Sequence, residues 1–282
     1  MNTPPKYEKI KRVGSGAQGE VWKAIRDSPR RTVALKIINV PQEETQMNQL
    51  LEELKNIKKM AIPNCHPNVV CYYDYSIDDD ILYIETEYIE GEDLHDYTKR
   101  LRERNEYEKL YRHLLAITKD LVEGLKYIHS KGVLHNDIKP GNIMVETSTL
   151  TPKFVDFGIS CSATSVCRLG SGKAPCCGGI SGTPTFASPE MYKDEKRYPV
   201  SDIWSLGMTL YESATGSYPY NYTSSDPNLR EAMQNIVDVD PKELNTSNQL
   251  LNTIVNRSLV RDPAERITAQ EISDLINNQL WF

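Results

Sequence analysis

The chain has 282 residues, of which 39% are hydrophobic and 26% are charged, and its formal net charge at pH 7 is -6. This size and composition predict a globular protein with one large domain or two lobes, and exclude a disordered or fibrous chain. The acidic charge excludes a broad electrostatic attraction to nucleic acid or to an anionic membrane, and favours basic partners. No apolar signal core and no apolar run of about 20 residues occurs, so we expect an intracellular, most simply cytoplasmic, protein without membrane insertion.

The first third of the chain reads mainly as strands. From Tyr7 to about Glu87, alternating or β-branched apolar residues predict strands in YEKIKRVGSG, EVWKAI, RTVALKIINV, NVVCYYDYS and ILYIETEY. One helix interrupts them, from about Glu43 to Met60, where apolar residues recur at helical spacing and Pro63 follows. We therefore expect a small sheet accompanied by a single helix.

After Gly91 the predicted secondary structure changes from strands to helices. Apolar residues at helical spacing predict helices in LYRHLLAITKDLVEGLKYIHSKG and SDIWSLGMTLYESATG. A boundary between the two parts is expected near residues 87–93. The Gly- and Ser-rich stretch SCSATSVCRLGSGKAPCCGGISG predicts a mobile loop.

Four of the six cysteines lie in that stretch: Cys161, Cys167, Cys176 and Cys177. Because disulfides are rare inside cells, we expect free thiols. Zinc binding is disfavoured because the spacing lacks paired CxxC motifs, and sensitivity to oxidation is favoured over zinc.

A glycine cluster, VGSGAQGEV, lies between the first two predicted strands. Gly14, Gly16 and Gly19 have the GxGxxG spacing, which lets backbone N–H groups approach phosphate oxygens. A strand rather than a helix follows, so the context of a dinucleotide-binding motif is missing. Taken alone, the cluster is equally well an ordinary hairpin turn.

A lysine, Lys36, occurs in the sequence VALK on the third predicted strand. A strand lysine is usually solvated, but one that grips nucleotide phosphates needs a carboxylate from a neighbouring helix. Glu52 and Glu53 both qualify by position. Ile57 follows Glu53 by four residues on what would be the inward face of the helix, so we choose Glu53.

Two polar motifs follow in the helical part. In HNDIKPGNIM, Asp137 would accept or orient a hydroxyl proton, Lys139 would neutralise phosphoryl charge and Asn142 would hold a magnesium ion. A polar loop capped by Asn and Asp is the alternative for this motif alone. In FVDFGIS, Asp156 ends a short apolar strand, which suits a second ligand to the same cation.

The motifs GxGxxG, VALK, HxDxKxxN and DFG occur in the order found in protein kinases. The sequence resembles the eukaryotic-type protein kinases, serine/threonine type, from about Tyr7 to the closing LWF. The resemblance implies an α+β fold with two lobes that bind ATP and Mg²⁺ between them. The implied division of this single domain is a small antiparallel-sheet lobe at 1–86, a hinge at 87–93, a mainly helical lobe at 94–282 and an activation segment at 156–190.

The resemblance also implies further nucleotide contacts. Thr86 would be the gatekeeper, the backbone of Glu87 to Ile89 would bind adenine, and Asp93 would meet the ribose. Val21 and Ala34 would cover the adenine from above, and Met144 would lie below it. The full implied set is Gly14, Ser15, Gly16, Gly19, Val21, Ala34, Lys36, Thr86, Glu87, Ile89, Asp93 and Met144.

Four residues are implied as supports of the active site. Glu190, in the sequence SPE, would pair with Arg266, and Asp202 would anchor the backbone of the catalytic loop. Thr183 would hydrogen-bond near Asp137 and Lys139. Lys139 and the sequence GTPTFASPE favour Ser/Thr residues of protein substrates over Tyr.

Asn136 departs from the family pattern. Many protein kinases carry Arg between the His and the Asp, where it can receive an activation-loop phosphate. Asn136 has no charge, so we expect that this latch is not required.

The sequence HND also resembles choline kinases and related small-molecule kinases, but these lack the Lys139 and DFG counterparts. Pseudokinases commonly lack the counterpart of Lys36, Asp137 or Asp156, whereas this chain keeps all three and Asn142. We therefore expect an ATP-dependent protein kinase.

Overall fold

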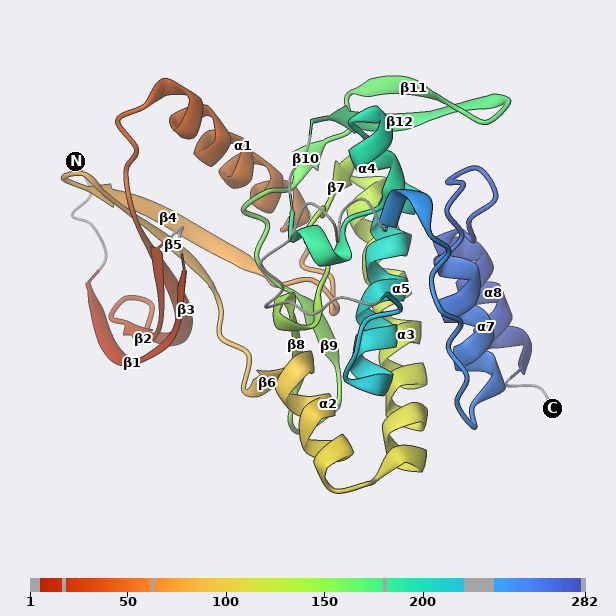
Figure 1. Cartoon of the computed structure of the whole chain (residues 1–282). Coiled ribbons are helices and arrows are strands. Elements are labelled where there is room, and N and C mark those ends of the chain that lie inside the picture. The colour runs from red at the N-terminus through yellow and green to blue at the C-terminus, as the bar shows by residue number, and fades with distance from the viewer. Residues whose placement is uncertain (1–5, 17–18, 62–63, 180–181, 221–235, 280–282) are drawn as a thin grey trace.

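The computed structural model describes residues 6–279 except 17–18, 62–63, 180–181 and 221–235. The chain has an α+β fold of two lobes, with a strand-rich part beside a mainly helical part (Figure 1). The predicted fold class is thus confirmed. Five strands form one antiparallel sheet in the order β1-β2-β3-β5-β4, accompanied by helix α1. Their bounds are β1 (Tyr7–Gly16), β2 (Gly19–Arg26), β3 (Arg31–Asn39), α1 (Glu44–Met60), β4 (Tyr72–Asp78) and β5 (Ile81–Glu87).

Side chains of β3 point alternately to the two faces of the sheet, and the two faces carry different residues. Val33 and Leu35 are fully buried on one face. Lys36 and Ile38 lie on the other face, because side chains of a strand point alternately to opposite sides. On that second face Ile38 packs against Leu54 of α1, which brings the helix close to Lys36.

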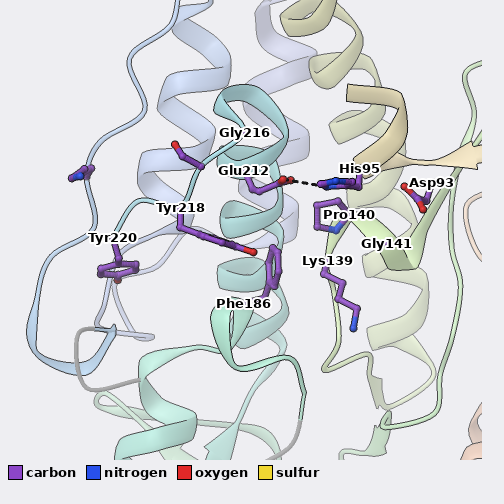
Figure 2. Close-up of a pocket in the computed structure, with 12 residues that line it drawn as sticks. Asp93, His95, Lys139, Pro140, Gly141, Phe186, Glu212, Gly216, Tyr218 and Tyr220 are labelled. Atoms are coloured by element: carbon purple, nitrogen blue, oxygen red, sulfur yellow. Dashed lines mark ion pairs between the residues drawn. The ribbon is translucent and has the colours of Figure 1, made fainter. Parts of the chain in front are cut away.

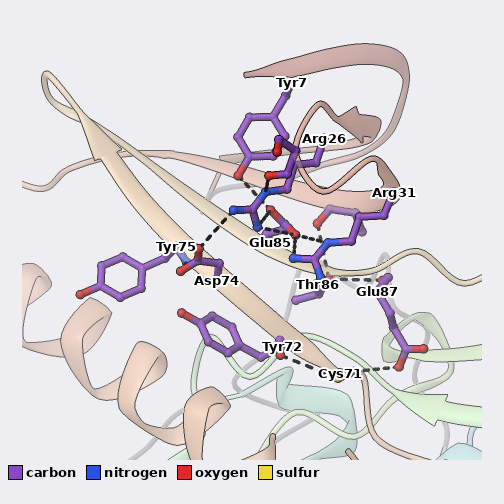
Figure 3. Close-up of polar contacts among 12 residues, drawn as sticks. Tyr7, Arg26, Arg31, Cys71, Tyr72, Asp74, Tyr75, Glu85, Thr86 and Glu87 are labelled. Atoms are coloured by element: carbon purple, nitrogen blue, oxygen red, sulfur yellow. Dashed lines mark hydrogen bonds and ion pairs between the residues drawn. The ribbon is translucent and has the colours of Figure 1, made fainter. Parts of the chain in front are cut away.

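A buried carboxylate holds the first face of the sheet together (Figure 3). Glu85 on β5 is fully buried. It accepts hydrogen bonds from Arg26 Nη1 and from the hydroxyl of Tyr7, both at 3.0 Å, and also pairs with Arg31. A buried charge is tolerated only when it is paired and hydrogen-bonded, and Glu85 meets that condition. The cluster fixes β5 immediately before Thr86.

The helical part is built around α5 (Pro199–Thr215), in which every residue from Val200 to Ala214 is buried. Apolar residues of α3, such as Leu121, join Trp204 of α5 in one large core. The other elements are β6 (Gly91–Asp93), α2 (Leu94–Glu103), α3 (Tyr107–Ser130), β7 (Val133–Leu134), β8 (Ile143–Glu146), β9 (Pro152–Phe154), α4 (Pro189–Asp194), α7 (Gln249–Ser258) and α8 (Ala269–Gln279), with 3₁₀ turns at Pro140–Asn142 and Pro184–Phe186. Among the described residues, no helix is long and apolar enough to cross a membrane.

The segment expected to be a mobile loop instead forms strands, so that prediction was wrong. β10 (Cys161–Ser162) pairs with β7, and β11 (Ser165–Leu169) and β12 (Gly172–Gly178) form a hairpin whose last residues pair with β13 (Lys196–Arg197). Gly170 at the turn has a φ of 56°, a conformation that glycine adopts without steric cost. Figure 1 shows the hairpin reaching out above α4.

The expectation of free thiols was also wrong. All six cysteines lie in the described residues and are paired, so none is left as a free thiol or as a zinc ligand. The pairs are Cys65–Cys71, Cys161–Cys177 and Cys167–Cys176, with Cα–Cα distances of 5.3, 6.5 and 5.8 Å. These separations suit disulfides, and the last pair follows from the register of the β11–β12 hairpin, which the sequence analysis had not anticipated.

Candidate active site

Helix α5 fixes the backbone of the predicted catalytic loop through Asp202, whose side chain is buried. The carboxylate accepts hydrogen bonds from the backbone N–H groups of His135 (3.0 Å) and Asn136 (2.9 Å), and lies 2.8 Å from Nε2 of His129. Burial would raise the pKa of Asp202, but the contacts with His129 and the loop outweigh it and lower the pKa. The loop is therefore held by an ionised carboxylate in the protein interior.

The geometry of Asn136 gives a physical reason for an asparagine at this position. Its φ is 65°, in the left-handed region that asparagine tolerates better than most residues. Its amide Nδ2 donates to the carbonyl oxygens of Leu134 (3.3 Å) and Ile159 (3.2 Å), and lies 3.1 Å from Sγ of Cys161. Asn136 is thus a neutral connector between the catalytic loop and residues 159–161, a role that its lack of charge alone did not indicate.

The carboxylate of Asp137 is the centre of a dense set of polar contacts. Oδ1 accepts hydrogen bonds from the hydroxyl (2.7 Å) and the backbone N–H (2.9 Å) of Thr183. Oδ2 accepts from Nδ2 of Asn142 (2.7 Å) and pairs with Nζ of Lys139 (2.9 Å). Burial would raise the pKa of Asp137, but the hydrogen bonds from Lys139 and Thr183 outweigh it and lower the pKa. The group is therefore an ionised, oriented carboxylate at neutral pH.

The approach of Thr183 to this loop depends on the glycine before it. Gly182 has a φ of 111°, and a Cβ at this position would lie 2.6 Å from the carbonyl oxygen of Asn136. Both conditions exclude a larger residue without movement of the loop. The segment that carries Thr183 can thus lie directly against the backbone beside Asp137.

Lys36 reaches across from the sheet. Its Nζ lies 2.8 Å from Oε1 of Glu53 and 3.4 Å from Oδ1 of Asp156. Burial would lower the pKa of Lys36, but Asp156 and Glu53 outweigh it and raise the pKa, so the ammonium stays charged. Glu52 instead accepts a hydrogen bond from Ser162, which leaves Glu53 as the contact of Lys36 on α1.

The two predicted magnesium ligands lie next to each other. The backbone N–H of Val155 donates to the carbonyl oxygen of Asn142 at 3.0 Å, which holds Asp156 close by. Because Nδ2 of Asn142 is directed at Asp137, its Oδ1 remains for a cation, and the Asp156 side chain is 44% exposed. Mg²⁺ binds proteins through a few oxygen ligands and completes its shell with water and phosphate, so this donor set fits the ion.

The residues implied for nucleotide binding lie on neighbouring strands. Gly16 pairs with Gly19 across the first hairpin, whose Ala17 and Gln18 fall outside the described residues. Ala34 pairs with Thr86. Further pairs bring Val21 opposite Lys36 and Asp93 opposite Met144. Gly14 and Ser15 lie on β1, and Ile89 lies two residues after the end of β5.

Two of these side chains have structural partners as well. The carboxylate of Glu87 is bound by Nζ of Lys153 at 2.9 Å, and its backbone N–H donates to the carbonyl oxygen of Cys71 at 2.9 Å, so its backbone carbonyl is the group left for the predicted adenine contact. Oδ1 of Asp93 accepts a hydrogen bond from the N–H of Asp96 at 2.9 Å and caps α2. One oxygen of Asp93 is therefore committed to the fold.

A cavity of about 580 Å³ beside the catalytic loop contains a carboxylate that the sequence analysis missed. Glu212, near the end of α5, faces His95 of α2, with Oε1 lying 3.3 Å from Nδ1 of the imidazole (Figure 2). Its Oε2 is buried without a hydrogen-bond partner, and burial raises the pKa of Glu212. Lys139 and Asp93 line the same cavity. The sequence pattern that could have indicated this carboxylate is the single acidic residue in the otherwise uncharged helix sequence GMTLYESATG.

The predicted support pair is also present. Arg266 donates two hydrogen bonds to Glu190, from Nη1 to Oε1 at 2.8 Å and from Nη2 to Oε2 at 2.9 Å. Both side chains are buried, and Ser201 donates to the same carboxylate at 2.6 Å. This bidentate pair ties α4 to the segment just before α8.

Comparison with known proteins agrees with this geometry. A family model described as the protein kinase domain matches residues 7–277. The chain therefore belongs to the protein kinase family. It is similar to mitogen-activated protein kinase kinase 3 of Arabidopsis thaliana (30% identity over 92% of the chain) and to the serine/threonine-protein kinase PAK mbt of Drosophila melanogaster (31% over 93%). It is also similar to the mitogen-activated protein kinase kinase SIPKK of Nicotiana tabacum (30% over 94%).

The similarities cover nearly all of this chain but a smaller share of each relative. The matched region spans 47% of the Arabidopsis kinase, 38% of the Drosophila kinase and 71% of the tobacco kinase. The chain thus corresponds to half or less of the first two relatives.

Proposed function

We propose that the chain is an ATP-dependent serine/threonine protein kinase, which transfers the γ-phosphoryl group of ATP to hydroxyl groups of proteins. The observation that carries the proposal is the position of Asp137, whose carboxylate is bound by Lys139, Asn142 and Thr183. The same site holds the ammonium group of Lys36, which is paired with the carboxylates of Glu53 and Asp156. Phosphoryl transfer depends on positioning and electrostatic stabilisation, and this arrangement provides both.

Each side chain has one task in this reaction. Asp137 orients the substrate hydroxyl and accepts its proton, and Lys139 balances the charge on the transferring group. Lys36, held by Glu53, binds the phosphates. Asn142 and Asp156 would hold Mg²⁺, which supplies charge neutralisation between the phosphates when it is bound.

The nucleotide would occupy the space beside the strands that carry Val21, Ala34 and Met144, with the hinge at 87–93. The backbone from Glu87 to Ile89 provides the polar groups for adenine. The hairpin with Gly14, Ser15, Gly16 and Gly19 covers the phosphates with backbone N–H groups.

Phosphate transfer from labelled ATP in the presence of Mg²⁺ tests the proposal. The acceptors are a panel of generic proteins and choline, and wild type is compared with Asp156→Ala. We expect label on Ser or Thr with wild type and a loss of at least about 100-fold in the variant, which lacks a cation ligand. Label on choline would instead indicate a small-molecule kinase. ATP binding without transfer to any acceptor would indicate a pseudokinase that serves as a binding module.

Glu212 leads to a prediction about substrate sequence. Glu212 lines a cavity next to Lys139, and one of its carboxylate oxygens is buried without a hydrogen-bond partner, so we expect preferred protein substrates to place an Arg or Lys side chain in that cavity. Glu212→Gln keeps the shape and removes the charge. We expect kcat/KM for a basic peptide to fall about 10- to 100-fold, as for the loss of a charge-assisted hydrogen bond.

Steady-state kinetics with matched peptides check this expectation. A peptide in which the basic residues are replaced by Ala should respond little to Glu212→Gln. Glu103→Gln, a change of the same kind at an exposed position of α2 outside the cavity lining, is the control and should leave both peptides unaffected. Equal losses for basic and neutral peptides would show that Glu212 only supports the fold.

A further inference from the structure

We propose that the paired cysteines of the segment 156–190 are a redox modification site that switches the catalytic centre on when they are oxidised. The site comprises the disulfides Cys161–Cys177 and Cys167–Cys176, and reacts with a small-molecule thiol–disulfide couple of the glutathione type. The inference rests on the proposed kinase function for its consequence, although the structural link itself is independent of that function.

Cys161 lies against the catalytic loop. Cys161 pairs with Leu134 in the two-stranded sheet of β10 and β7, directly before His135 and Asn136. The amide of Asn136 lies 3.1 Å from its sulfur. One half of the disulfide is therefore in contact with the loop that carries Asp137.

The residues on either side of Cys161 contact the helix that holds Glu53. The hydroxyl of Ser162 donates to Glu52 at 2.6 Å, and Asn56 Nδ2 donates to the carbonyl oxygen of Ser160 at 3.3 Å. Asn56 is fully buried, so its contact with Ser160 is shielded from water. The placement of β10 thus affects both the catalytic loop and the position of α1 relative to Lys36.

The other half of the disulfide lies at the far end of the segment. Cys177 on β12 pairs with Arg197 of β13, and the N–H of Gly179 donates to the carbonyl oxygen of Glu195 at 2.9 Å. Thr183, six residues after Cys177, contacts Asp137. The Cys161–Cys177 bond therefore joins the start of the segment to the strand that leads into the Thr183 contact.

The second disulfide stabilises the hairpin between these ends. Cys176 is fully buried and packs against Tyr198 and Val200, which lead into α5. The hydroxyl of Tyr198 donates to the carbonyl oxygen of Arg168 at 2.9 Å. Both disulfides thus secure the hairpin against the part of the molecule that anchors the catalytic loop.

Asn136 makes this covalent link significant. An arginine at this position could tie the loop to a phosphate on the segment, whereas the neutral amide of Asn136 contacts Ile159 and the disulfide sulfur instead. The cysteine bridge therefore connects the segment to a residue that contacts the catalytic loop without any phosphate. We therefore assign to the disulfides the ordering role that a charged latch has elsewhere.

Thiol–disulfide exchange with the small-molecule couple reduces and re-forms the protein disulfide. Cys161 and Cys167 are partly exposed residues, whereas Cys176 and Cys177 are buried, so we expect a thiolate to attack from the side of Cys161. It forms a mixed disulfide with Cys161 and releases the thiol of Cys177. A second small-molecule thiol then displaces Cys161, so that two thiols lose two electrons and two protons, and the protein disulfide gains them. Oxidation is the reverse.

The experiment equilibrates the whole chain in buffers of defined ratios of reduced to oxidised glutathione. Alkylation and mass spectrometry count the free thiols, initial rates give kcat/KM, and hydrogen exchange is followed in residues 133–137. We expect reduction of Cys161–Cys177 to lower kcat/KM about 5- to 150-fold, the usual range of coupling between sites, and to accelerate exchange at 133–137. Cys161→Ser/Cys177→Ser should stay at the low activity in every buffer.

Cys65→Ser/Cys71→Ser is the matched control, because it removes a disulfide outside the segment and should retain the response. Equal activity of wild type in both redox states, or full activity of Cys161→Ser/Cys177→Ser, would overturn the proposal. So would six alkylated thiols in the oxidising buffer. If wild type transfers no phosphate in either state, the kinase function fails, and hydrogen exchange at 133–137 still decides whether the link orders the loop: an unchanged rate overturns it.

Discussion

Asp137→Asn is expected to lower kcat for phosphoryl transfer by about 10²- to 10⁴-fold, the contribution of a positioned general base. The amide keeps the size of the side chain but removes the charge that orients the hydroxyl and accepts its proton. Because the pKa of Asp137 is lowered, wild type carries the charged carboxylate throughout the neutral pH range. The variant lacks this charge at every pH in that range. Initial rates with saturating ATP and a Ser/Thr peptide measure the effect.

ATP affinity should change little in this variant, because Lys36, Glu53 and Asp156 are untouched and lie across the site. Calorimetric titration with Mg²⁺ and ATP checks that point. Asp120→Asn, the same exchange at a partly exposed position of α3, is the control and should keep full activity. An Asp137→Asn variant with wild-type kcat would remove Asp137 from the catalytic role proposed for it.

The fold was predictable where local patterns act alone. Alternation along the strands and the 3.6-residue period of α1 and α3 place buried residues on one face, and tertiary packing agrees with those patterns. The same periodicity favoured Glu53 over Glu52, and the structure has Glu53 beside Lys36. Resemblance in motif order supplied the two-lobed arrangement, because length and composition alone did not distinguish two lobes from one large domain.

The misses share a physical cause: each depends on partners that the local sequence pattern does not identify. The hairpin β11–β12 forms in a Gly- and Ser-rich stretch of low strand propensity, because disulfides and packing against Tyr198 outweigh that propensity. Cysteine spacing alone does not give a pairing. The buried carboxylate of Glu85 and the free oxygen of Glu212 were missed for the same reason, since their partners and surroundings come from other elements.

Arg266→Met is expected to destabilise the protein by about 3–5 kcal/mol, because it leaves the carboxylate of Glu190 buried without its partner. For a protein of this size, such a loss lowers Tm by about 6–20 °C. Thermal unfolding followed by circular dichroism measures the change. Arg257→Met, which breaks an exposed ion pair with Glu271 at 3.7 Å, is the control and should cost less than about 1 kcal/mol.

The pH dependence identifies the cause of the loss. In wild type, burial would raise the pKa of Glu190, but Arg266 and Ser201 outweigh it and hold the pKa below its ordinary value of 4.5. The pair therefore stabilises the protein above about pH 4.5, and this contribution is lost as pH falls through the folded-state pKa. Without Arg266, burial instead raises the pKa of Glu190 above its ordinary value, so the variant gains stability as pH falls toward the pKa of Glu190 in the unfolded state.

The difference in Tm between wild type and Arg266→Met should consequently be largest at neutral pH and shrink in acid. Glu190→Leu/Arg266→Met, which leaves no buried charge, should recover part of the loss and show no such trend. An Arg266→Met variant with a pH-independent loss would point to lost packing rather than to the unpaired carboxylate.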